Sequence, residues 1–162
     1  MIDEIDLQIL NIMQYNARVS NAEIARQVGM APSAILERIR KLETRGIIQG
    51  YETRLNPKAL GLGLLAYVFV RSEEPLGSGE TGKKLTEIPE VQEVHHIAGE
   101  DCYLVKVRAE NTEALGHLLR QRFGAIGSIR STRTTIVLLA LKETTHLQIN
   151  IPTPEDDDAQ RE

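Results

Sequence analysis

The sequence has one cysteine, no tryptophan and only 4% aromatic residues in 162. A single cysteine excludes an intramolecular disulfide, which agrees with a reducing compartment. Because single-stranded nucleic acid stacks on aromatic rings, so few rings argue against that kind of surface. No apolar run approaches the ~20 residues of a membrane helix. Residues 1–6 are acidic and lack the basic start of a secretory signal, so we expect a cytoplasmic protein without membrane association.

Patterns for catalysis, cofactors and metals are also missing. The sequence contains no phosphate loop and no nucleophile elbow, so we predict neither an enzyme nor a bound cofactor. The adjacent His95 and His96 would face opposite sides of a strand. Together with Cys102 and His117 they match no common zinc spacing, so no metal site is predicted. Cys102 is interpreted as a packed thiol.

The net charge of -4 is unevenly distributed along the chain. Residues 31–45 carry four basic and two acidic side chains, whereas residues 59–162 have a net charge of -5. Affinity for phosphate groups depends on local charge density rather than on the total. Residues 31–45 are therefore the candidate segment for contact with nucleic acid.

The first third of the chain contains three helix patterns. Apolar residues at helical spacing predict helices over Asp3–Tyr15, Ser20–Val28 and a segment that starts at Pro32 and ends before Gly46. Ser20 and the glutamate three residues later have the spacing of a capping box. Pro32 fits the first turn of the third helix, and a glycine follows each of the last two helices.

The segment Ile47–Leu55 then predicts a short hairpin. Three short helices, a tight turn and a hairpin are typical of a winged helix-turn-helix domain, which we place at residues 1–50. Its third helix would enter the major groove of double-stranded DNA, and the start of the second helix would donate to a phosphate. The alternative is an ordinary three-helix domain with a solvated basic face. The predicted DNA-binding residues are Arg18, Ser20, Asn21, Ser33, Ala34, Glu37, Arg38, Arg40 and Lys41.

The rest of the chain alternates strand and helix patterns. Residues 51–63 are predicted as a hairpin strand and linker. The elements that follow have the order β-α-β-β-α-β, which is the ferredoxin-like arrangement, and we assign residues 64–151 to this domain. His146–Ile151 would add an edge strand. Residues 152–162, with five acidic residues and two prolines, predict a disordered tail. The expected fold class is α+β. The expected elements are Leu64–Val70, Gly82–Ile88, Val91–Ala98, Cys102–Val107, Thr112–Phe123 and Ile129–Leu141.

Six motifs in the first third resemble the Lrp/AsnC family of feast/famine regulators, and together they are dense across residues 2–57. The resemblance implies regulation of transcription by binding promoter DNA. It also implies a homodimer that assembles to a tetramer or octamer. The motifs are Ile5–Leu10, Ala17–Ala25, Gly29–Ser33, Leu36–Glu43, Gly46–Tyr51 and Leu55–Pro57.

The same family joins its DNA-binding domain to a βαββαβ domain that dimerises and binds small molecules, commonly amino acids. Many members carry Gly-Asp-x-Asp-Tyr at the turn between the middle strands. Here Cys102 replaces the second aspartate, which removes a carboxylate from the pocket. The alternative is a tight turn closed by a buried tyrosine. The resemblance implies a ligand site at Gly99, Glu100, Asp101, Cys102, Tyr103, Thr132 and Thr134.

The sequence therefore predicts an oligomeric DNA-binding transcriptional regulator, modulated by a small molecule such as an amino acid. One alternative is a nucleoid-like architectural DNA binder with little effector response, which would bind promoter and random DNA equally. The other is an amino-acid-binding regulatory subunit of an enzyme, which would show no salt-dependent DNA binding.

Overall fold

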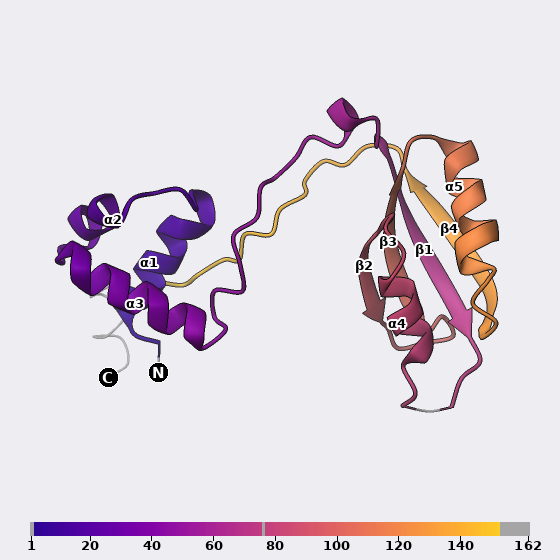
Figure 1. Ribbon diagram of the computed structural model, residues 1–162, viewed down its shortest axis with the longest axis horizontal. Helices are drawn as coiled ribbons and strands as arrows, with labels where there is room; N and C mark the ends of the chain where they lie inside the picture. Colours follow the sequence, from indigo (N-terminus) through magenta and orange to yellow (C-terminus); the bar gives the residue numbers. More distant parts are fainter. Residues whose placement is uncertain (1, 76, 153–162) are drawn as a thin grey trace, which may run out of the picture. The chain divides into compact units, whose positions relative to one another are not determined.

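The computed structural model describes residues 2–75 and 77–152, and the chain divides into two compact units (Figure 1). The first unit combines residues 2–53 with the described residues from 143 onward, and the second comprises residues 54–142. The chain therefore passes between the units twice. The acidic tail predicted from residue 152 lies, apart from Pro152, outside the described residues.

Three helices form the first unit, as the sequence predicts. They are α1 (Glu4–Tyr15), α2 (Asn21–Val28) and α3 (Pro32–Thr44). Each contributes apolar side chains at helical spacing to one core, because only that stripe of each helix can be removed from water. The buried members of this core are Ile9, Ile24, Ala25, Ile35, Ile39 and Leu42.

The capping box forms at α1 rather than at α2. The Asp3 carboxylate accepts from the Asp6 N–H at 2.8 Å, and the Asp6 carboxylate accepts from the Asp3 N–H at 3.2 Å. At α2 the Ser20 hydroxyl accepts from the Glu23 N–H, but the Glu23 carboxylate bonds Arg26 instead of returning to the cap. The box expected at Ser20 is thus half formed.

The hairpin expected over Ile47–Leu55 is wrong, because none of the described residues from 45 to 63 forms a strand. Gly46 adopts φ +68°, and the N–H groups of Ile47 and Ile48 both bond the carbonyl of Leu42. The two isoleucines pack on the helical core. An isolated two-stranded hairpin is only marginally stable, so packing on the helices prevails.

The second unit contains a four-stranded antiparallel sheet with the order β2-β3-β1-β4. This order and the intervening helices confirm the ferredoxin-like arrangement. The elements are β1 (Leu64–Ser72), α4 (Glu80–Thr86), β2 (Val91–His96), β3 (Tyr103–Ala109), α5 (Thr112–Leu118), a π-helical turn (Leu119–Phe123) and β4 (Ile129–Val137), preceded by a short 3-10 helix (Lys58–Leu60).

The two faces of this sheet have different environments. Helices α4 and α5 lie on the same side of the sheet and cover it (Figure 1). Val68, Val70, Val105 and Val107 point to that side and are fully buried. Side chains at alternate positions, Tyr67 and its neighbours, point to the opposite face, which no described helix of this unit covers.

Strand β4 ends earlier than predicted, at Val137, and the expected edge strand over His146–Ile151 is absent. The chain leaves the sheet and joins the first unit instead. The Gln14 side-chain amide donates to the Leu147 carbonyl at 3.0 Å and accepts from the Leu147 N–H at 2.9 Å. The rings of Tyr15 and His146 meet edge-on with centroids 4.7 Å apart. The end of α1 thereby holds the segment that follows the sheet.

Candidate DNA interface and effector site

Helix α3 presents a polar face opposite its buried stripe. Successive residues of an α-helix are rotated by about 100°. The side chains placed farthest from the buried isoleucines therefore point to solvent, which is the arrangement that a recognition helix needs in a major groove. The predicted DNA-binding residues on this exposed face are Ser33, Glu37, Arg40 and Lys41.

The charged side chains on this face form only an exposed ion pair within the described residues. Lys41 Nζ lies 2.6 Å from Glu37 Oε1, and both side chains are 68% exposed. The Lys41 ammonium lowers the pKa of Glu37. Solvent-exposed pairs of this kind contribute little stability, so either partner can be released to DNA. Within the described ranges, the Arg40 guanidinium has no hydrogen bond or ion pair, which leaves it available for phosphate or base contacts.

The start of α2 also carries exposed donors. Arg18 and Ser20 are exposed, and Asn21 is half-buried. The Ser20 hydroxyl accepts from a backbone N–H as the helix cap, so its own hydrogen remains free to be donated. These side chains have the position and chemistry for contacts with a phosphate at the helix N-terminus.

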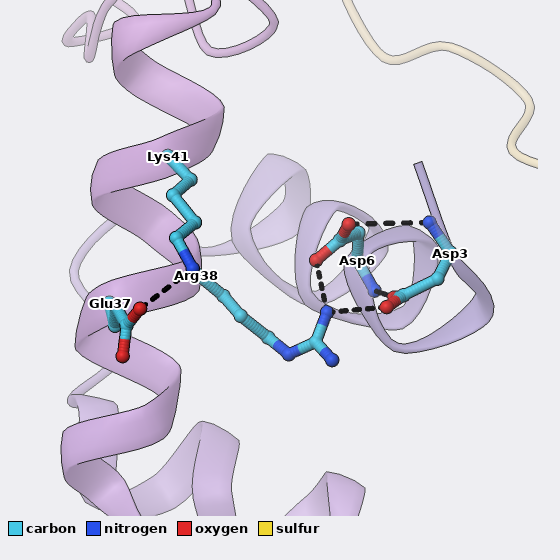
Figure 2. A network of polar contacts seen from close by, with 5 residues as sticks. All are labelled: Asp3, Asp6, Glu37, Arg38 and Lys41. Carbon is cyan, nitrogen blue, oxygen red and sulfur yellow. Dashed lines mark hydrogen bonds and ion pairs between the residues drawn. The ribbon is translucent and has the colours of Figure 1, made fainter. Parts of the chain in front are cut away.

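Arg38 differs from the other basic residues of α3 because it is turned toward α1 (Figure 2). Its Nη1 donates to Asp3 Oδ2 and to Asp6 Oδ1, each at 2.7 Å. These bonds raise the pKa of Arg38. The pKa of Asp3 is lowered by the N–H of Asp6 and then by Arg38. The structure thus separates Arg38 from the exposed face on which the sequence placed it.

Some of the predicted DNA-binding residues line one open pocket with a volume of about 420 Å³. It lies between the N-terminus of α1 and the side of α3. Ala34 is half-buried there, and the carboxylates of α1 lie among the cations of α3. The lining residues are Asp3, Asp6, Ala34, Glu37, Arg38, Lys41, Leu42 and Arg45.

In the second unit, Tyr103 and the two threonines lie on the helix-covered side of the sheet. Val70 pairs with Tyr103 on one side and with Thr132 on the other, so the three form a row across β3, β1 and β4. Thr134 occupies the equivalent position beside Val68. The structure therefore brings these three predicted ligand residues to one face.

Tyr103 is buried and bonded to a loop carboxylate that sequence reasoning missed. Its hydroxyl donates to Glu74 Oε1 at 2.7 Å, and its ring packs so closely on Gly82 that an added Cβ there would lie 2.8 Å from ring carbon Cε1. Glu74 also accepts from the Ser78 hydroxyl and the Thr81 N–H. The register of β1 with β3 places residues after β1 beside the start of β3, which is the signal that could have identified Glu74.

The ionisation of Glu74 follows from these bonds. Burial alone would raise the pKa of Glu74, but the donors from Tyr103, Thr81 and Ser78 outweigh it and lower the pKa to about 2. Burial and the bond to Glu74 in turn raise the pKa of Tyr103. Among the described residues, no cation pairs with Glu74, so a half-buried negative charge lies beside the predicted effector turn.

The turn itself sends its side chains in different directions. Gly99 has φ +127°, in the region that favours glycine. Asp101 Oδ2 pairs with Arg133 at 3.0 Å, and Arg133 lies 3.9 Å above the Phe69 ring on the sheet face without helices. The Cys102 thiol lies 3.5 Å from the Ser72 carbonyl. Glu100 is exposed. One subunit therefore does not gather all seven predicted residues into one pocket.

The described part of the chain contains no group of three or more side chains that could hold a metal ion. None of its helices is long and apolar enough to cross a membrane.

Comparison with known protein families matches both units. Residues 2–43 match the AsnC-type helix-turn-helix domain, and residues 65–147 match the Lrp/AsnC ligand binding domain. The HTH-type transcriptional regulator FL11 of Pyrococcus furiosus is 36% identical over 149 residues, which cover 92% of this chain and 97% of that protein. The leucine-responsive regulatory protein of Escherichia coli is 35% identical over 150 residues, covering 91% and 92%.

Solved structures agree with these relatives. The transcriptional regulator NMB0573 of Neisseria meningitidis, in complex with L-Met, superposes with a TM-score of 0.86 at 28% identity and covers 93% of this chain and 98% of that one. The feast or famine regulatory protein Rv3291c of M. tuberculosis, complexed with L-methionine, gives 0.84 at 34% identity, covering 94% and 100%. Escherichia coli AsnC gives 0.83 at 32%, covering 90% and 98%.

Proposed function

The chain belongs to the Lrp/AsnC family of transcriptional regulators, and from that premise we propose how its two units divide the work. It is a regulator with a DNA-binding helix-turn-helix, not an enzyme. We propose that α3 lies in the major groove, with Ser33, Glu37, Arg40 and Lys41 toward the bases and phosphates. Arg18, Ser20 and Asn21 contact the backbone, and Ala34 packs near the groove wall. Such a regulator acts where its DNA is held, which we propose to be the cytoplasm.

The observation that carries this proposal is the guanidinium of Arg40, which lies on the exposed face of α3 and has no hydrogen bond or ion pair with any described residue. Because no ion pair with a described residue has to be broken, only the hydration and rotamer freedom of Arg40 oppose its contact with a phosphate. Its neighbours Lys41 and Glu37 are joined only by an exposed ion pair. The buried stripe on the other side of α3 fixes the helix while leaving this face open.

We propose that two copies associate through the uncovered sheet face. Tyr67, Phe69 and Leu104 are only half-buried there, and Arg133 lies over the Phe69 ring. The same face also carries charged side chains, among them Lys106 beside Tyr67 and Arg133 beside Phe69. A second copy would cover its apolar side chains symmetrically. A dimer presents two recognition helices to DNA, and its half-sites are expected one helical turn, about 34 Å, apart. Tetramers or octamers would extend this pairing.

We propose that the second unit binds an amino acid near the Gly99 turn, as two of the similar structures hold L-methionine. An amino acid needs an acceptor for its ammonium and donors for its carboxylate. Glu100, Asp101 and the ionised Glu74 supply negative charge, and the Gly99 backbone with Thr132 and Thr134 supplies donors. Cys102 and Tyr103 shape the turn. Because the chain crosses between the units twice, a shift in one unit acts on the other through two connections.

The test is fluorescence anisotropy with two labelled duplexes, the DNA upstream of the protein's own gene and a random duplex of equal length. We expect tighter binding to the upstream duplex, weaker binding at higher salt, and a change in affinity with at least one amino acid of a full panel. Equal affinity for both duplexes without an amino-acid effect would favour the architectural binder. No binding at low salt would favour the regulatory subunit of an enzyme.

A further inference from the structure

The Arg38 guanidinium links the N-terminus of α1 to the side of α3 (Figure 2). In each of the two aspartates, one carboxylate oxygen accepts from a backbone N–H and the other accepts from Arg38. Asp3 Oδ1 and Asp6 Oδ2 accept the reciprocal backbone bonds of the capping box, whereas Asp3 Oδ2 and Asp6 Oδ1 accept from Arg38. The cap of α1 and the anchor of α3 are therefore one network.

The inner part of this network is buried, whereas the Asp3 side chain is 53% exposed. The Asp6 side chain is 10% exposed and that of Arg38 is 27% exposed. A buried carboxylate is costly unless a cation and hydrogen bonds satisfy it. Arg38 supplies both for Asp6, so moving Arg38 to DNA would leave the carboxylate buried and unpaired.

The position of Arg38 on α3 agrees with this role. It follows the buried Ile35 by three residues, which places it about 60° from that side chain around the helix. Arg40 follows Ile35 by five residues and lies about 140° away. Arg38 therefore lies at the edge of the buried stripe of α3, whereas Arg40 lies on the exposed face. Helix α3 also packs less extensively on α1 than on α2. The hydrogen bonds of Arg38 therefore add contacts on the side of α3 that faces α1.

We propose that Arg38 is a positioning residue, which fixes the orientation of α3 through Asp3 and Asp6 and does not itself bind DNA. The proposal rests on the placement of α3 in the major groove. A phosphate would have to compete with two carboxylates for Arg38. Without the link, the buried stripe still holds α3 on the core, but the side of the helix toward α1 loses a restraint. Small shifts of α3 then move its exposed side chains out of register with the bases.

The test uses the full-length chain, the upstream duplex and a random duplex, with dissociation constants measured over a series of KCl concentrations. The variants are R38A, R38K, D6N and the double variant R38A/D6N, and R40A is the matched control. Thermal melting followed by circular dichroism identifies the temperature range in which each variant is fully folded. Binding is compared only within that range.

We expect R38A to weaken binding to the upstream duplex by about tenfold, the scale of one lost base contact, and binding to random DNA much less. The slope of log affinity against log salt should stay unchanged, because no phosphate contact is lost. D6N should act in the same direction, R38A/D6N should be no worse than R38A, and R38K should recover part of the loss. R40A should reduce the slope by about 0.9.

Three results would overturn the proposal. The first is a fall in slope of about one for R38A with equal weakening on both duplexes, since Arg38 would then bind phosphate directly. The second is D6N binding more tightly with a steeper slope, because Asp6 would then withhold Arg38 from DNA. The third is unchanged binding of folded R38A. If instead R40A alone had no effect, the placement of α3 would be contradicted, and the comparison of R38A with D6N would still decide the role of Arg38.

Discussion

The Tyr103 hydroxyl donates to Glu74 across 2.7 Å, which joins the first residue of β3 to the loop after β1. The same loop is fixed at its far end by Thr81, whose fully buried hydroxyl lies 2.7 Å from that of Ser128. The structure around the predicted effector turn is therefore held by polar contacts between segments distant in sequence.

The Tyr103→Phe variant should be less stable than the wild type. The substitution keeps the ring against Gly82 but removes the donor to an ionised carboxylate, and we expect a loss of about 1–2 kcal/mol in the free energy of unfolding. Urea denaturation followed by circular dichroism measures this loss. Tyr67→Phe is the matched control, because the described contacts include no hydrogen bond from the Tyr67 hydroxyl. Equal stability of Tyr103→Phe and the wild type would contradict the role of the bond.

The contribution of Glu74 should depend on pH. Because its pKa is lowered from 4.5 to about 2, the folded state favours the carboxylate. The resulting stability is fully present above about pH 5 and is lost as the pH falls toward 2. The stability difference between the wild type and Glu74→Gln should therefore shrink over that interval, as measured by urea denaturation at a series of pH values. A constant difference would show that Glu74 contributes through contacts independent of its charge.

The sequence predicted the elements that depend on local spacing and missed those that depend on distant partners. The stripe of Ile35, Ile39 and Leu42 is visible in the residues themselves, as is the order of strands and helices. The predicted hairpin was wrong because Ile47 and Ile48, which favour a strand, pack on the helical core. The residues within this segment do not reveal that its isoleucines pack on the helices instead of forming strands.

The same distinction applies to the candidate sites. Exposure on α3 follows from helical spacing, so Arg40 and Lys41 were placed correctly on the open face. Arg38 was predicted on the same face, but it bonds two aspartates that lie more than thirty positions earlier in the sequence. Glu74 was invisible for a similar reason, since only the register of β1 with β3 brings it to Tyr103.

Loss of the Gln14 side chain should release the segment after the sheet. The amide makes both hydrogen bonds to the Leu147 backbone, so Gln14→Ala leaves that N–H without this partner. We expect hydrogen exchange around Leu147 to become faster by at least several-fold, as measured by mass spectrometry. Gln8→Ala on the same helix removes only an exposed bond to Glu4 and should leave exchange there unchanged. Identical protection in both variants would show that Gln14 does not hold the segment.

A charge on the uncovered sheet face should prevent self-association. Phe69→Glu replaces an apolar ring of the proposed interface with a carboxylate beside Arg133, and removing that charged pair from water costs more free energy than burying the ring. Sedimentation velocity should then show a monomer where the wild type forms a dimer or larger species. The control is Lys83→Glu on the exposed surface of α4, which should leave the oligomer intact. A dimeric Phe69→Glu variant would place the interface elsewhere.

Hydroxyl-radical footprinting of the full-length protein on its own upstream DNA tests the central claim most directly. Two recognition helices in successive major grooves should protect two short backbone regions whose centres are about 10 base pairs apart. The protection should weaken in Arg40→Ala and disappear at high salt. Uniform protection without this spacing, or none at low salt, would contradict the assignment of α3 as the element that reads DNA.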